Sequence, residues 1–179
     1  YYGVTAGLLE MFGKERVMDT PISEIAISGA SVGAALVGAR SILEVGFVDF
    51  VGTCWDQIFN QAAKFSYMSG GRARVPMVIR MACGAGLAYG VHHSQSLAAW
   101  FTHVPGVKVG MPSTAADAKG LLLGAIDDDN PVIFLEHKFL YAEKGDVADG
   151  PQRIPIGKAS VARQGRDVTI IAWSRAVHW

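Results

Sequence analysis

A carboxylate at the start of a predicted helix is the first feature of the sequence that could do chemistry. Glu24 is the only formal charge between Asp19 and Arg40. Pro21 fixes its own φ and favours an extended residue before it, so a helix can begin just after this point. The helix dipole helps to hold a carboxylate there, beside an apolar surface. Glu24 could therefore handle protons, or it could only complement the end of the helix.

Two adjacent histidines, His92 and His93, lie in the glycine-rich stretch 84–96. This stretch follows an apolar run at 75–82 that is typical of a strand buried on both faces. Neighbouring side chains of an extended segment point in opposite directions, so at most one imidazole should face a given pocket. Each histidine could take part in proton transfer or could only bond to the backbone.

Strand-like and helix-like segments alternate as far as residue 135. We expect strands at 16–18, 41–50, 75–82, 107–111 and 132–135, and helices at 3–12, 22–40, 54–68, 97–102 and 115–126. The alternation predicts an α/β fold, an open and mostly parallel sheet with helices on both faces. Ligands bind such sheets at the carboxyl ends of their strands. Glu24, Phe50 and residues 84–96 each follow a predicted strand, so they should meet at that edge.

Other motifs are weaker. Gly46, inside the predicted strand 41–50, could mark a bulge or a close approach. The acidic turn 127–130 (DDDN) could hold a hard cation, although a solvated turn is the simpler interpretation. Cys54 and Cys83 have no zinc spacing, and no Walker loop occurs. The glycines between 84 and 90 do not fit a dinucleotide fingerprint, because the third comes one residue late.

Composition narrows the function classes. Half of the 179 residues are hydrophobic and only 18% are charged, so we expect partner chains to cover part of the surface. A formal net charge of zero gives no sign of a nucleic-acid or anionic membrane partner. The longest weakly polar run, 25–39, is too short for a membrane span. Two distant cysteines indicate a reducing compartment rather than a disulfide framework.

The alternation fails after residue 140. Residues 141–160 are rich in polar residues, Gly and Pro, which indicates a linker, and residues 167–173 would be the first strand of a following domain. The chain has no initiator Met and stops after an apolar run without a turn. We therefore expect a piece of a longer polypeptide, with one domain over 1–140, a linker over 141–160 and the start of a truncated domain over 161–179.

A series of motifs recurs in a fixed order: 19–24 (DTPISE), 56–64 (DQIFNQAAK), 67–71 (YMSGG), 93–95 (HSQ), 105–109 (PGVKV), 117–121 (DAKGL) and 130–132 (NPV). Together they resemble the β subunit of thiamine-diphosphate-dependent 2-oxo acid dehydrogenase E1 components. Residues 47–50 (FVDF), 84–87 (GAGL) and 136–138 (EHK) are most similar to the acetoin dehydrogenase branch. The resemblance implies a pyrimidine-binding domain over about 1–140 and the beginning of a transketolase C-terminal-like domain after the linker.

The resemblance also implies roles for single residues. Glu24 would hydrogen-bond N1′ of the cofactor's aminopyrimidine and exchange a proton there, which suits a carboxylate shielded from water. Phe50 would stack on the pyrimidine. Gly46 would line the cofactor site where many relatives carry Met. His93 would face the reacting carbon, donating to the substrate oxygen or helping acyl transfer. The reaction would cleave the C–C bond next to a carbonyl and pass the acyl unit to a lipoyl acceptor.

Half of the implied site is missing from the chain. The family holds the diphosphate and Mg²⁺ through a Gly-Asp-Gly…Asn motif, and residues 145–147 (GDV) are not that motif. An α subunit would hold Mg²⁺, in an α₂β₂ assembly with a second β subunit, and a lipoyl-bearing E2 would take the product. A structural K⁺ of some relatives would match Met77, Ala125, Ile126, Asp128 and Asn130. The compartment would be the bacterial cytoplasm, or the mitochondrial matrix in a eukaryote.

Two other interpretations stay open. The chain could be a truncated, non-catalytic module that oligomerises but binds no cofactor. It could also be a fragment of a self-contained transketolase-type enzyme, with its diphosphate-binding domain elsewhere on the polypeptide. Within the E1 interpretation, acetoin is the first substrate hypothesis, and pyruvate or a branched 2-oxo acid is the second.

Overall fold

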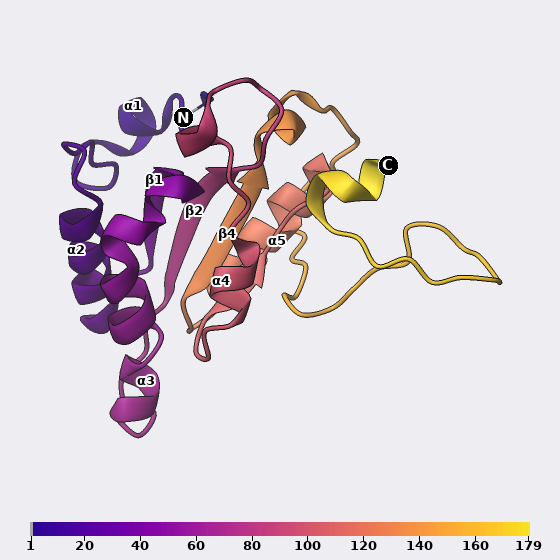
Figure 1. Cartoon of the computed structure of the whole chain (residues 1–179). Coiled ribbons are helices and arrows are strands. Elements are labelled where there is room, and N and C mark those ends of the chain that lie inside the picture. The colour runs from indigo at the N-terminus through magenta and orange to yellow at the C-terminus, as the bar shows by residue number, and fades with distance from the viewer. Residues whose placement is uncertain (1) are drawn as a thin grey trace.

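A four-stranded parallel sheet forms the centre of the molecule (Figure 1). The computed structural model describes residues 2–179, so residue 1 of the predicted first domain lies outside the described part. The strand order is β1-β2-β4-β3, and every neighbouring pair is parallel. The strands are β1 (Ser41–Phe47), β2 (Met77–Cys83), β3 (Lys108–Gly110) and β4 (Val132–His137). The predicted α/β fold with a parallel sheet is confirmed.

Helices cover both faces of this sheet. The α-helices are α1 (Leu8–Phe12), α2 (Glu24–Leu36), α3 (Phe65–Met68), α4 (Ala98–Thr102) and α5 (Ala115–Asp127). The 3₁₀-helices are η1 (Val48–Cys54), η3 (Val91–His93), η4 (Lys138–Ala142) and η5 (Ser174–His178), and η2 (Gln57–Ala62) is a π-helix. The predicted helix 54–68 is therefore three shorter pieces of different pitch.

The alternation of side chains along β2 explains why its sequence is apolar throughout. Ile79 and Met81 point into the larger core cluster, which also contains residues of α2 and η1. Val78 points to the opposite face, where it packs with Ala125 of α5. All seven residues of β2 are buried. Successive residues of a strand face opposite sides, so a strand covered on both sides needs apolar residues at nearly every position.

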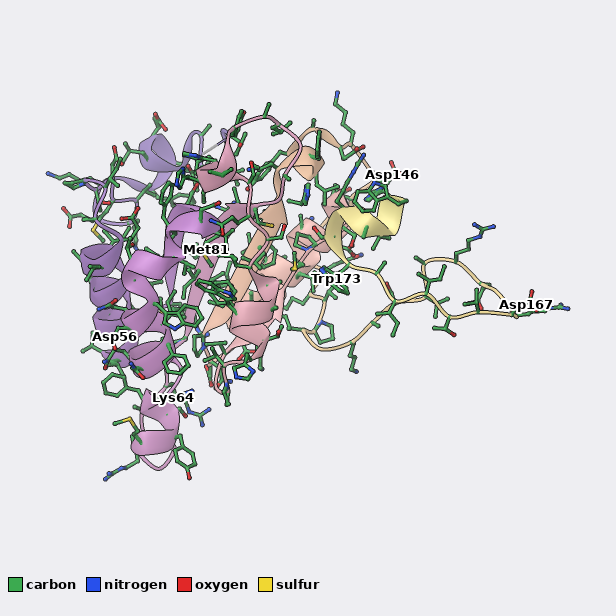
Figure 2. The ribbon with its side chains drawn as sticks, in the orientation of Figure 1. Asp56, Lys64, Met81, Asp146, Asp167 and Trp173 are labelled. Carbon is green, nitrogen blue, oxygen red and sulfur yellow. The ribbon has the colours of Figure 1, made fainter. Side chains whose placement is uncertain are left out.

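Two predicted strands are wrong. Residues 16–18 form a turn, in which the amides of Arg16 and Val17 both donate to the carbonyl of Gly13. Residues 167–173 contain no strand, and Ile170 and Ile171 are more than 80% exposed. Figure 2 shows Asp167 at the tip of an excursion that extends away from the sheet. An apolar, β-branched run becomes a strand only beside a neighbour that takes its hydrogen bonds, and neither run lies against the four strands described here.

The carboxyl edge of the sheet collects the segments that carry the predicted site. The N-terminus of α2, the 3₁₀-helix η1, the loop that contains η3, and η4 all lie at this edge (Figure 1). Register fixes the edge, because Cys83 pairs with His137 and β2 and β4 therefore end together. None of the helices within residues 2–179 is both long enough and apolar enough to cross a bilayer.

Gly106 is the glycine with the least room in the fold. Its φ is +105°, and a Cβ at this position would overlap the carbonyl oxygen of Ala63. We expect Gly106→Ala to lower the free energy of unfolding by about 1–3 kcal/mol, because backbone has to move. Gly52→Ala is the matched control, since a Cβ there meets nothing within 4 Å. Denaturant unfolding of the two variants measures the difference, and equal midpoints would contradict the prediction.

Candidate functional site

Three aromatic rings from three segments meet at the carboxyl edge. The His93 ring lies 4.7 Å from the Phe47 ring and 5.3 Å from the Phe50 ring, edge-on to both at 81° and 82°. Phe47 ends β1, Phe50 lies in η1, and His93 ends η3. The prediction that Phe50 and the loop 84–96 meet at one edge is therefore confirmed. The two histidines also point differently, because His92 is exposed and His93 is half-buried.

A bulge in β1 turns the chain toward this cluster. Val45 pairs with Met81 and Phe47 with Ala82, so Gly46 has no partner residue on β2. An extra residue of this kind bends the strand and increases its twist. The bulge predicted at Gly46 is confirmed, and it is followed directly by η1, which carries Phe50.

Glu24 occupies the first position of α2, and its side chain is half-buried. α2 packs against η1, the segment that holds Phe50. Burial raises the pKa of the Cys54 thiol in η1, and the negative charge of Glu24 raises it further, so the carboxylate lies near η1. Within residues 2–179 the Glu24 carboxylate makes no hydrogen bond or ion pair. A partly buried carboxylate without a partner is costly, and a ligand that donates a hydrogen bond would satisfy it.

The loop that carries His93 is closed at its neck. The Gly84 amide donates to the Gln95 carbonyl at 2.9 Å, and inside the loop the Ser94 hydroxyl donates to the Gly90 carbonyl at 2.8 Å. Gly84 and Gly86 have φ of +92° and +112°, and their Cα atoms lie directly against the side chains of η4 and its preceding residue. A loop with joined ends that packs on its own neighbours can hold a side chain in one place.

Two charged residues that the sequence did not reveal hold the loop on the carboxyl side of His93. Asp49 Oδ1 accepts from the Ser94 amide at 3.2 Å and from the Gln95 amide at 3.1 Å. Lys138, only 3% exposed, donates its ammonium to the His93 carbonyl. No periodicity or catalytic motif marks either residue in the sequence. The available signal was their place in the segments FVDF and EHK, each of which contains the end of a strand.

Beneath this edge lies a buried ionic network. Arg80 of β2 is 5% exposed and donates to both carboxylate oxygens of Glu136, at 2.9 and 2.8 Å. Glu44 of β1 is its second partner at 3.5 Å, and the Tyr141 hydroxyl donates to Glu136 at 2.5 Å. Burial disfavours the charged form of Arg80, but the Glu136 and Glu44 carboxylates outweigh this effect and raise the pKa of Arg80. Burial and the Glu136 carboxylate raise the pKa of Tyr141 well above its usual value. The network links three neighbouring strands, β1, β2 and β4.

The residues predicted for a potassium site lie in β2 and at the end of α5, away from the aromatic cluster: Met77, Ala125, Ile126, Asp128 and Asn130. Two cationic side chains already bind oxygens of this set. Arg40 donates one nitrogen to the carbonyls of Ile126 and Asp128, at 2.9 Å each. Lys108 pairs with the Asp128 carboxylate at 2.5 Å. Burial works to raise the pKa of Asp128, but the hydrogen bonds from Lys108 and Asn130 lower it. A potassium ion here would have to share its carbonyl ligands with Arg40.

Comparison with known proteins places the chain in a family. It is 53% identical over 176 residues to the acetoin:2,6-dichlorophenolindophenol oxidoreductase subunit beta of Cupriavidus necator, which covers 98% of this chain and 52% of that protein. It is 49% identical over 173 residues to the pyruvate dehydrogenase E1 component subunit beta of Rickettsia felis, over 97% of this chain and 53% of that protein. The chain thus spans about half the length of the curated relatives it matches.

Solved structures agree on the fold. A split gene transketolase, described as an inactive β4 tetramer, superposes with a TM-score of 0.71 over 92% of this chain and 50% of that one, at 20% identity. The model of the transketolase pyrimidine-binding domain matches residues 1–144, which include every strand of the sheet and all three rings of the cluster. The chain therefore belongs to the transketolase pyrimidine-binding domain family.

Proposed function

We propose that the chain is the pyrimidine-binding part of the β subunit of a thiamine-diphosphate-dependent E1 enzyme. The enzyme would cleave the C–C bond next to a carbonyl of acetoin, or of pyruvate or another 2-oxo acid, and transfer the acyl unit to a lipoyl acceptor. The observation that carries this proposal is the half-buried Glu24 carboxylate, which has no bonded partner within residues 2–179 and lies beside the segment of Phe50. Relatives named as acetoin and pyruvate dehydrogenase β subunits support it.

Each site residue has a task that its position allows. Glu24 would accept or share a proton at N1′ of the aminopyrimidine, because its half-buried carboxylate has no other bonded partner within residues 2–179. Phe50 would offer its ring face to the pyrimidine, and Gly46 would line the cofactor site beside it. His93 would donate to the substrate oxygen. Thiamine diphosphate, when bound, supplies a carbon nucleophile at C2 and takes up the electrons of the broken bond.

The rest of the proposed site would come from a partner. No group of three or more His, Cys, Asp or Glu suited to a metal occurs within residues 2–179. We propose that an α subunit holds the diphosphate and Mg²⁺, that two β subunits and two α subunits assemble, and that a lipoyl-bearing E2 receives the acyl unit. Exposed apolar side chains at the two ends of α2, Ile25 within it at 57% and Val37 directly after it at 86% exposure, support burial by another chain.

Calorimetry tests the shared site. We expect the β chain alone to bind thiamine diphosphate and Mg²⁺ weakly, with a Kd at least about 100-fold higher than that of the α–β complex, since half of the contacts are absent. Titration of the cofactor into the β chain, the α chain and their mixture measures this difference. Equally tight binding by the β chain alone would contradict the proposal and favour a self-contained enzyme. Absence of binding to the mixture would favour a non-catalytic module.

Some predictions extend the proposal. A structural K⁺ at the turn after α5 stays a prediction. We also propose that residues 141–160 link the pyrimidine-binding domain to a transketolase C-terminal-like domain that begins within 161–179. The compartment would be the cytoplasm of a bacterium or the mitochondrial matrix of a eukaryote. Absence of any K⁺ effect on thermal unfolding of the assembled enzyme would contradict the ion site.

A further inference from the structure

Lys138 is a buried cation to which the proposed reaction assigns no role. It is the first residue of η4, directly after β4, and its side chain is 3% exposed. A buried ammonium is unfavourable unless its surroundings replace the lost water. Its surroundings here belong to the site: the ammonium donates to the His93 carbonyl and lies 5.3 Å from the Phe47 ring and 5.5 Å from the Tyr89 ring.

The two aromatic contacts hold the Lys138 ammonium next to His93. A cation is attracted to the face of an aromatic ring, more strongly where water is excluded. Phe47 is the last residue of β1, and Tyr89 lies in the loop that carries His93. Phe47 also contacts the His93 ring edge-on at 4.7 Å. Lys138 and the imidazole therefore share one aromatic neighbour, and the lysine contacts His93 through its backbone as well.

Asp49 completes the restraint from the other side. Its Oδ1 atom accepts the two amides that follow His93, those of Ser94 and Gln95. The Lys138 ammonium thus holds the carbonyl of His93, and the Asp49 carboxylate holds the amides of the next two residues. Burial raises the pKa of the Cys83 thiol to about 12, and the charges of Lys138 and Asp49 both act on it, so both lie around the end of β2.

The residues next to Lys138 hold the base of the same loop. A Cβ on Gly84 would overlap the His137 ring, and one on Gly86 would overlap the Phe139 ring. The last residue of β4 and the first two of η4 therefore contact the His93 loop, His137 and Phe139 at these two glycines and Lys138 at the His93 carbonyl. Glycine is required at both base positions, because φ is positive and the space is filled.

We propose that Lys138 is the positioning residue of His93: its ammonium fixes the His93 carbonyl, and with it the direction in which the imidazole meets the substrate. This inference rests on the proposed function, because it needs His93 to act on the substrate. Lys138 itself touches neither cofactor nor substrate. Its removal should therefore affect the step that uses His93 and leave the proton exchange that uses Glu24 intact.

A double-mutant cycle in the full-length β subunit, assembled with its α subunit, tests the inference. We expect Lys138→Met to lower kcat for acetoin about 10- to 100-fold, the size of effect that a misplaced catalytic group produces. In a His93→Ala background, Lys138→Met should lower kcat by less than about 2-fold, because the residue through which Lys138 acts is gone. Lys144→Met, at an exposed lysine, is the matched control and should leave kcat unchanged. Additive losses in the cycle, or an unchanged kcat in the single variant, would overturn the proposal.

A second readout separates this inference from the proposed function. The exchange of the cofactor C2 proton for deuterium, followed by quenched NMR, should stay at the wild-type rate in Lys138→Met. Slowed exchange in that variant would show a general disturbance of the site and would overturn the positioning role. Unchanged exchange in Glu24→Gln would instead refute the proposed function. If Lys138→Met does not fold, Lys138→Leu removes the donor with a shorter apolar side chain, and the same cycle with the same criterion applies.

Discussion

Glu24→Gln is expected to lower turnover of the assembled enzyme by at least about 100-fold, because general acid–base catalysis contributes about 10²- to 10⁴-fold. Glutamine has nearly the shape of glutamate but cannot take up or release the proton. Glu24 sits half-buried at the start of α2 and has no hydrogen bond or ion pair within residues 2–179, so apart from the helix dipole no described group depends on its charge. The exchange rate of the cofactor C2 proton should fall in parallel with kcat.

The control for this variant is Glu15→Gln, which removes a carboxylate of the exposed turn before α2. It should leave kcat, proton exchange and the unfolding midpoint as in the wild type. Glu24→Gln should also keep the wild-type midpoint, because the lost carboxylate has no folded-state partner among the described residues. Wild-type turnover in Glu24→Gln would refute the assignment. A lowered midpoint would show that the carboxylate serves the fold.

Arg80→Met should produce the largest loss of stability. The guanidinium is 5% exposed and neutralises Glu136 and Glu44, which stand on the strands to either side. Removing the guanidinium leaves the buried Glu136 carboxylate without its counter-charge, and the loss of one partner of a buried ion pair costs about 3–5 kcal/mol. Denaturant unfolding of the full-length β subunit measures the change. Arg166→Met, in the exposed C-terminal segment, is the matched control and should stay within about 0.5 kcal/mol of the wild type.

A second substitution distinguishes charge from packing at this site. If the loss comes from the uncompensated Glu136 carboxylate, then adding Glu136→Gln to Arg80→Met should recover part of the lost free energy. If the loss comes from packing alone, the double variant should be no more stable than the single one. The Tyr141 hydroxyl still has an acceptor in the glutamine side chain. A loss below about 1 kcal/mol in Arg80→Met would contradict the ionic argument.

The sequence was informative wherever a local rule decides the structure. Apolar runs with helices between them predicted a parallel sheet, because a strand covered on both faces has to be apolar throughout. The start of α5 was also readable, since Thr114 and Asp117 form a reciprocal cap that needs only four residues of chain. Gly46 marked the bulge in β1 for a similar reason. The motif series also indicated the family that residues 1–144 match.

The tertiary structure decided what depends on neighbours distant in sequence. Residues 16–18 and 167–173 have strand-like composition, yet no strand lies beside either to take their hydrogen bonds. From the sequence alone, Lys138 looks like a surface lysine. It is buried in the fold because the loop of His93, 45 residues earlier, closes over it. The sequence by itself thus determined the sheet, its carboxyl edge and the place of Phe50 and the His93 loop at that edge. Which of them touch was decided by the packing of loops over strand ends, because such contacts follow from shape and not from a repeating pattern.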